Sequence, residues 1–173
     1  MKLINWEEVE ESKPSTMLEP GGYVCRIVAV EDVPSKEYLW IVYDVAEGPC
    51  AGTYAGIGPS DDWKHRFTRS YKDTARGMFK AFVNRVEESN PGFKWDGSDE
   101  RQFVGKLVGL VFQKEQYTND KGDDKERTVV VGVESADDIR KDDYYMPEPK
   151  DRRTKVAAAP ASQSGPYDDI PFL

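Results

Sequence analysis

Residues 21–55 read GGYVCRIVAVEDVPSKEYLWIVYDVAEGPCAGTYA, and the order of strands in this stretch decides the fold. Residues 23–31 are rich in β-branched and apolar side chains, which are typical of a strand. A proline-containing turn follows, because proline fixes its φ angle and has no N–H to donate. Residues 37–46 predict a second strand, and a third begins at residues 52–55 after a Gly-Pro turn. Three strands joined by short turns form a meander.

The second expected strand has two unlike faces, because side chains alternate along a strand with a period of two. One face suits a hydrophobic core and carries Leu39, Ile41, Tyr43 and Val45. The opposite face carries Tyr38, Trp40, Val42 and Asp44. Two large aromatic rings beside a carboxylate fit a core poorly, so we interpret this second face as a ligand surface.

One helix and two further strands complete the expected fold. Residues 70–88 predict the helix, with Ser70 as its N-cap and Asp73 three residues later. Residues 103–117 and 126–134 predict long strands. Five strands with a helix between the third and fourth predict a mainly β protein with a five-stranded OB-fold barrel. An open α+β sheet remains the alternative.

The composition changes near residue 145 and divides the chain into two expected parts. Residues 1–144 are predicted to form the OB-fold domain. Residues 145–173 contain prolines, an alanine run and a Ser-Gln-Ser-Gly sequence, which predict a disordered linker that ends in an acidic interaction tip.

Composition argues against several functional classes. The formal net charge is −8, so bulk charge does not indicate nucleic-acid binding. The chain has one histidine and two cysteines without CxxC spacing, so we expect no metal site, no cofactor and no catalysis. The thiols fit a reducing compartment, and neither a signal peptide nor a membrane-spanning run is recognised. We therefore expect a soluble, cytoplasmic protein.

A local basic segment nevertheless predicts binding to a single nucleic-acid strand. Residues 61–69 are expected to form a connector in which aromatic and basic residues alternate, and a basic ridge follows on the helix. Cations that follow phosphates and rings that stack on bases are typical of single-strand binding. The candidate binding residues are Arg26, Tyr38, Trp40, Trp63, Lys64, Arg66, Phe67, Arg69, Lys72, Arg76, Lys114, Tyr117 and Arg127.

The last residues carry the most specific motif. Asp168, Asp169, Ile170, Pro171 and Phe172 place two carboxylates before two apolar anchors, a pattern that suits a peptide ligand. This sequence resembles the C-terminal tip of bacterial single-stranded DNA-binding proteins, in which an OB-fold binds the strand. The resemblance implies that the tip recruits replication, recombination or repair proteins. Leu173 departs from the pattern, because it places the free carboxylate one residue beyond Phe172.

The core is similar to phage-encoded single-stranded DNA-binding proteins over residues 18–134. The similarity lies in the LEPGGY entry, the turn from Glu47 to Gly52, and the FVGK sequence at residues 103–106. Together the two resemblances imply a non-catalytic protein of phage replication or recombination that acts in the bacterial cytoplasm, and they leave open whether it is a homo-oligomer. The alternative is an OB-fold adaptor or recombination mediator that binds protein rather than DNA.

Overall fold

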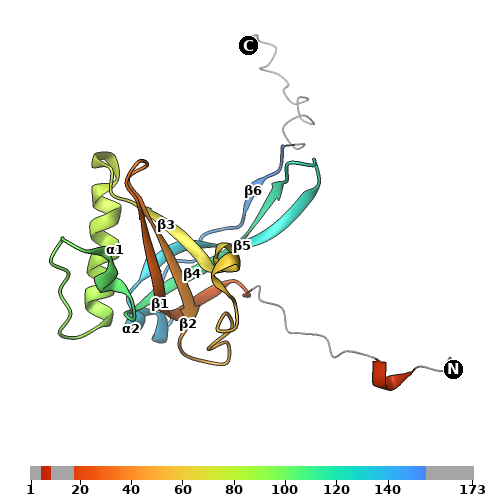
Figure 1. The fold of residues 1–173 in the computed structure, drawn as a ribbon, viewed down its shortest axis with the longest axis horizontal. Coiled ribbons are helices and arrows are strands. Elements are labelled where there is room, and N and C mark those ends of the chain that lie inside the picture. The colour runs from red at the N-terminus through yellow and green to blue at the C-terminus, as the bar shows by residue number, and fades with distance from the viewer. Residues whose placement is uncertain (1–4, 9–17, 155–173) are drawn as a thin grey trace, which may run out of the picture.

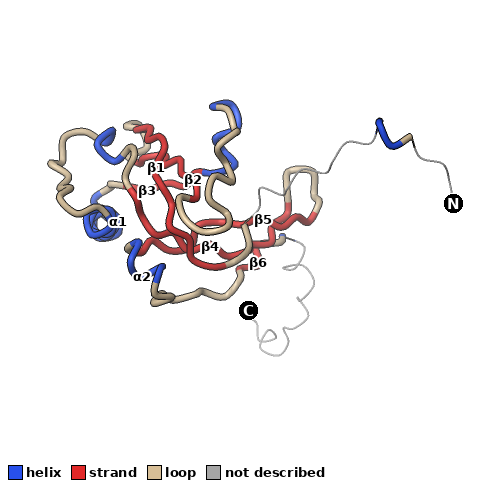
Figure 2. Tube along the Cα trace, turned by 90° about the horizontal axis from the view of Figure 1, so that it is seen from below, coloured by secondary structure: helices blue, strands red, loops and turns tan. Residues whose placement is uncertain are grey.

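The computed structural model describes residues 5–8 and 18–154, and their architecture is mainly β. A six-stranded sheet carries most of the fold, with the 14-residue helix α1 packed against it and shorter helices around it (Figures 1 and 2). The strands are β1 (Gly21–Val33), β2 (Tyr38–Val45), β3 (Arg66–Ser70), β4 (Leu107–Thr118), β5 (Asp124–Glu134) and β6 (Lys150–Arg152). The helices are η1 (Trp6–Glu8), η2 (Pro59–His65), η3 (Asp73–Ala75), α1 (Arg76–Ser89), η4 (Glu100–Phe103) and α2 (Ala136–Arg140).

The sheet is an open path with the order β3-β2-β1-β4-β5, and each of these pairs is antiparallel. The short strand β6 lies off this path and pairs in parallel with the far half of β4. Within the described residues, β3 and β5 end the path without pairing to each other, so the sheet is not closed. The mainly β fold is confirmed, as is a helix between the third and fourth strands.

The predicted third strand at residues 52–55 is wrong. These residues form consecutive turns, in which the backbone N–H groups of Thr53 and Ala55 each donate to the carbonyl three residues earlier. The third strand is β3, which lies in the segment expected to be a connector. Only Phe67 of its five residues is buried, so β3 lacks the apolar pattern by which a strand is usually recognised.

The inward face of β2 is predicted correctly. Its four apolar residues are all buried, and they join a core that also contains the fully buried rings of Phe82, Phe103 and Phe112. The second face is only partly exposed, since Val42 is buried as well. Tyr38 and Trp40 keep part of their surface accessible and contact each other edge to face, with ring centroids 5.5 Å apart.

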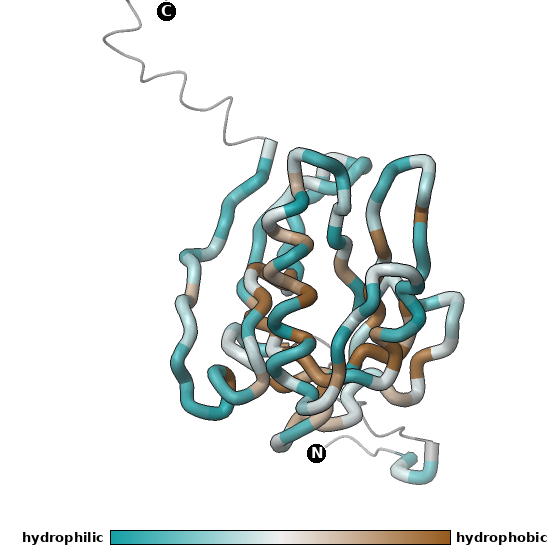
Figure 3. The backbone as a smooth tube through the Cα atoms, turned by 90° about the vertical axis from the view of Figure 1, so that its left-hand side faces the viewer, coloured by the Kyte–Doolittle hydropathy of each residue, from teal (hydrophilic) through white to brown (hydrophobic). Residues whose placement is uncertain are grey.

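Helix α1 begins six residues later than expected, because Ser70 belongs to β3 and pairs with Tyr38. The hydroxyl of Ser70 donates to the Glu37 carbonyl over 3.2 Å, so the predicted N-cap role is wrong. Hydrophobic and hydrophilic positions alternate along α1, the helix nearest the viewer in Figure 3. Phe82, Val83 and Val86 are buried against the sheet, whereas Met78 is 65% exposed.

Two glycines allow the chain after β5 to approach the sheet. A Cβ atom on Gly109 would lie 2.5 Å from a side-chain carbon of Ile139, and one on Gly22 would lie 2.8 Å from the Tyr144 ring. Tyr144 also accepts a hydrogen bond from the Gly22 N–H over 2.9 Å. The absence of side chains at these glycines thus lets α2 and Tyr144 pack closely on β1 and β4.

Residues 145–154 differ from the disordered segment predicted there. Gln113 donates a side-chain hydrogen bond to the Pro147 carbonyl over 2.8 Å, and Lys150–Arg152 form β6 beside Glu115–Tyr117 of β4. Figure 1 shows the far end of the β4–β5 hairpin projecting away from α1, with β6 alongside it. The start of the expected linker is therefore part of the sheet, while residues 155–173 lie outside the described residues.

Candidate functional site

The largest candidate site is a groove where the sheet is open between β3 and β5. It has a volume of about 780 Å³ and is lined by both terminal strands of the sheet path, with further residues from β2, η2 and the end of β4. Its lining residues, which define the seam groove, are Trp40, Tyr43, Tyr54, Trp63, Lys64, Arg66, Phe67, Thr68, Tyr117, Arg127, Thr128, Val129 and Val130. Seven of the thirteen predicted binding residues therefore meet in one groove, although they come from distant parts of the sequence.

Three cations of the seam groove lie against aromatic rings. The Arg66 guanidinium is 3.8 Å from the centroid of the Trp40 ring, and that of Arg127 is 4.3 Å from Tyr117. The Lys64 ammonium is 5.5 Å from the Trp63 ring. Such contacts contribute about 0.5–1 kcal/mol each at exposed sites. They hold cations next to flat apolar surfaces along the groove.

The rings differ in how much surface they offer to a ligand. Trp63 is 63% exposed because η2 carries it at the margin of the sheet. Trp40 is half-buried between Arg66 and Tyr38. Phe67 is buried and contacts Tyr43 and Phe82, so the structure places this predicted binding residue in the core wall of the groove.

The groove cations also differ in their counter-charges. Arg127 pairs with Glu115 over 2.7 Å, and Arg152 binds the other carboxylate oxygen over 2.6 Å. Burial alone would raise the pKa of Glu115, but hydrogen bonds and charge from the two arginines outweigh it and leave the pKa lowered. Lys64 and Arg66 have no ion pair with a carboxylate in the part of the chain that the structure describes, and they are the groove cations free to meet an anion.

Several predicted binding residues lie outside the seam groove. Arg69 and Lys114 line a neighbouring cleft, and Lys114 pairs with Glu126 over 3.5 Å. Arg26 donates to the Gly105 carbonyl over 2.9 Å. Tyr38 does not line the groove but contacts Trp40, which does, and Lys72 lies in the turn between β3 and η3.

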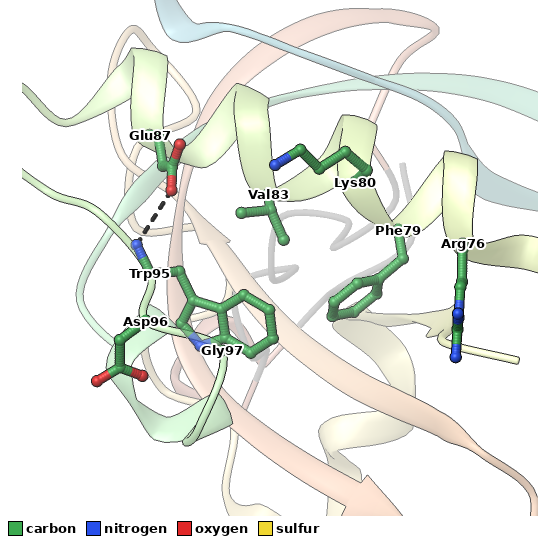
Figure 4. A pocket seen from close by; sticks show the side chains of 8 residues that line it. All are labelled: Arg76, Phe79, Lys80, Val83, Glu87, Trp95, Asp96 and Gly97. Atoms are coloured by element: carbon green, nitrogen blue, oxygen red, sulfur yellow. Dashed lines mark hydrogen bonds between the residues drawn. The ribbon is translucent and has the colours of Figure 1, made fainter. Parts of the chain in front are cut away.

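Arg76 belongs to a separate hollow of about 380 Å³ on α1, which we call the helix pocket. It is lined by Arg76, Phe79, Lys80, Val83, Glu87, Trp95, Asp96 and Gly97, as Figure 4 shows. Glu87 accepts a hydrogen bond from the Trp95 backbone N–H over 3.0 Å, which with the Lys94 charge lowers the pKa of its carboxyl. Arg76 and Lys80 of the predicted basic ridge therefore line this pocket together with the carboxylates of Glu87 and Asp96, whereas Lys72 does not.

The structure adds groove residues that the sequence analysis does not single out. Tyr54 stacks on the buried ring of His65, with centroids 4.8 Å apart and planes 6° from parallel. The Nδ1 atom of His65 lies 2.5 Å from the Tyr43 carbonyl oxygen. Residues 128–130 line the opposite wall. The aromatic side chain of Tyr54 is the signal that the sequence offers, but no hydrophobic pattern marks the turns that position it.

The predicted tip residues Asp168, Asp169, Ile170, Pro171 and Phe172 lie outside the described residues, so their role stays a prediction. Among residues 5–8 and 18–154, no group of three or more His, Cys, Asp or Glu side chains is placed to hold a metal ion. No helix in the same residues is long and apolar enough to cross a membrane.

Comparison with known proteins gives no family for this chain. A scan against protein-family models and a search of curated proteins both find no match. The resemblances to bacterial and phage single-stranded DNA-binding proteins therefore remain predictions from short motifs.

Proposed function

We propose that the chain is a single-stranded DNA-binding protein and that the strand lies in the seam groove. The observation that carries this proposal is the meeting of Trp40, Trp63 and Tyr117 with Lys64, Arg66 and Arg127 in one groove. Rings accept bases by stacking, and the neighbouring cations accept phosphates. Each ring has a cation beside it, so one nucleotide can meet both groups.

The arrangement favours an unpaired strand over a duplex. Stacking on Trp63 needs the flat face of a base, and this face is covered in a duplex by the neighbouring base pairs. The net charge of −8 disfavours unspecific attraction to DNA, so the local cations must supply the electrostatic contribution. We expect low sequence preference, since every base has a face that can stack.

The proposal includes an assignment of the fold. We propose that the sheet is an OB-fold whose barrel stays open between β3 and β5, where the strand enters. The order of five strands and the helix between the third and fourth support this assignment. The proposed setting is phage replication or recombination in a bacterial cytoplasm, without enzymatic activity.

Titration of the full chain with labelled oligo-dT across a salt series tests the proposal. Binding should weaken with salt, with a log–log slope of roughly −0.7 for each phosphate neutralised. Quenching of tryptophan fluorescence at saturation is expected if Trp40 and Trp63 stack on bases. No binding at low salt would contradict the proposal and favour the protein-binding adaptor.

The proposed partners of the C-terminal tip need a separate test. We propose that residues 168–173 recruit replication, recombination or repair proteins, with Phe172 as the apolar anchor. A pull-down with the full chain and with Phe172→Ala should then recover such a protein only with the former. Equal recovery by both chains would contradict the tip as the binding element.

A further inference from the structure

A second hollow continues from the seam groove. This cleft has a volume of about 360 Å³ and shares Val129 and Val130 with the groove, so one wall of β5 serves both. Its other lining residues come from β3, α1, β4 and the segment 147–152, and we call it the C-terminal cleft. They are Arg69, Met78, Gln113, Lys114, Glu115, Val131, Pro147, Glu148, Lys150 and Arg152.

Arg69 is one of two cations of this cleft without a carboxylate partner in the described residues. Its guanidinium lies 5.2 Å from the centroid of the Phe67 ring, and its Nη1 donates to the Thr68 carbonyl over 3.2 Å. Burial lowers the pKa of this guanidinium, because withdrawal from water destabilises its charged form. Arg69 forms no ion pair within the described residues, so an anion in the cleft would compensate its lost hydration.

The C-terminal segment supplies the second cationic wall. Lys150 is exposed at the start of β6 and forms no ion pair in the part of the chain that the structure describes. Arg152 is held by Glu115, which also binds Arg127 of the seam groove. The Glu115 carboxylate therefore links Arg127 in the wall of the seam groove to Arg152 in the wall of the C-terminal cleft.

We propose that a single strand leaving the seam groove over Val129 and Val130 places a phosphate in the C-terminal cleft, against Arg69 and Lys150. This inference rests on the proposed function and extends its binding path to a segment that the composition assigns to a linker. Besides Glu148 and the arginine-bound Glu115, the described residues that line the cleft provide cations and an apolar floor but no aromatic ring, so it is a phosphate subsite rather than a stacking site.

Oligonucleotide length separates this subsite from the groove. The full chain is titrated with oligo-dT of about 5 and about 12 nucleotides, which span the site sizes typical of such folds. Arg69→Gln and Lys150→Gln should each weaken binding of the longer oligonucleotide several-fold, up to about tenfold for Arg69 as expected for one charge-assisted contact. Both should change binding of the shorter one less than twofold. The salt slope for the longer strand should decrease by about 0.7 per lost phosphate contact.

Arg101→Gln is the matched control, since Arg101 is an exposed arginine paired with Asp99 and lies outside both hollows. It should leave binding of both lengths unchanged. Thermal unfolding checks that Arg69→Gln stays folded, and the exposed Lys150 gives a second variant that does not depend on the core.

Four outcomes would overturn the inference. Equal losses for both lengths would place Arg69 and Lys150 in the groove site itself, and no loss would leave the cleft outside the path. If the Arg69→Gln effect disappears in a chain without residues 167–173, the cleft holds the acidic tip instead of a phosphate. If the unmodified chain binds neither oligonucleotide, both the proposed function and this subsite fall.

Discussion

The seam groove and the helix pocket contain similar residues but offer different chemistry. Both combine a tryptophan with basic side chains. In the groove, Trp63 is 63% exposed and the nearby Lys64 and Arg66 have no carboxylate partner in the described residues. In the pocket, Trp95 packs against Phe79 and Phe103 and donates its indole N–H to the Asp99 carbonyl.

The difference shows that the partners of a residue, more than its type, decide its role. Trp95 has its polar group and its ring face occupied within the fold, so it stabilises the loop after α1. Glu87 and Asp96 reduce the positive charge beside it. The groove keeps the exposed ring of Trp63 and the cations of Lys64 and Arg66, which have no carboxylate partner in the described residues, and these are groups that a ligand needs.

The largest expected effect is a difference in unfolding free energy between variants of Trp95 and Trp63. Trp95→Ala should lower the free energy of unfolding by about 2–4 kcal/mol, because it removes a large side chain packed on the core. Trp63→Ala should change it little, since most of that side chain is exposed. Urea denaturation followed by circular dichroism measures both values. Equal destabilisation by the two variants would contradict the division into structural and ligand-facing rings.

The next largest effect is a difference in DNA affinity between variants of the seam groove and a variant of the helix pocket. Trp40→Ala and Trp63→Ala should each weaken oligo-dT binding by about 1–3 kcal/mol, the usual contribution of one stacked base. Phe79→Ala in the helix pocket serves as the comparison and should leave the affinity of the folded chain unchanged. Fluorescence anisotropy of a labelled oligo-dT measures the dissociation constants. Full affinity in both tryptophan variants would show that the rings of the groove do not stack on bases.

A smaller effect concerns the acid stability that Glu115 gives to the groove wall. Its pKa is lowered from 4.5 by the two arginines, so its contribution is complete above about pH 4.5 and is lost as the pH falls through the lower folded value. Glu115→Gln should therefore cost about 1–2 kcal/mol of unfolding free energy at pH 7. The difference from the unmodified chain should shrink toward pH 3.

Urea denaturation at pH 7, 5, 4 and 3 gives this comparison. Lys94→Gln, which removes an exposed ammonium group that pairs with Glu87 over 3.4 Å, is a control in which only a small change is expected. A difference between Glu115→Gln and the unmodified chain that stays constant down to pH 3 would disprove the linkage.

The smallest effect is a change in salt dependence. Arg66→Gln should reduce the log–log salt slope of oligo-dT binding by about 0.7, because one phosphate contact is lost. Arg76→Gln in the helix pocket should leave the slope unchanged, although both variants remove one positive charge from a predicted basic segment. Similar slopes for the two variants would mean that only net charge matters.

The sequence predicts those parts of the fold in which burial follows a simple period. The alternation along β2 identifies its four inward residues, and the apolar segments 107–112 of β4 and 129–133 of β5 identify those strands. The strand β3 could not be found this way, since it presents one apolar residue among arginines and hydroxyl side chains. Hydrophobic patterns do not predict the strand β6 either, because its three residues are charged and exposed. It is held instead by pairing with β4 and by the contact between Arg152 and Glu115.

The candidate site follows the same rule. The aromatic and basic residues of the groove are recognisable from the sequence because stacking and phosphate binding require these types. The sequence does not predict that Arg76 and Lys80 lie outside the groove. The boundary between β3 and α1 decides which cations face the groove, and no pattern in the sequence marks it. The assignment of Ser70 as an N-cap rather than a strand end concealed that boundary.

The parallel pairing of β6 with β4 also has a mechanical consequence. A force applied to the chain beyond Arg153 reaches β6 first, and β6 is attached through three residue pairs and the Arg152–Glu115 contact. The load then passes to the projecting β4–β5 hairpin before it reaches the core around Phe103. A partner that pulls on the C-terminal end would thus strain the wall of the seam groove while the remainder of the sheet keeps its shape.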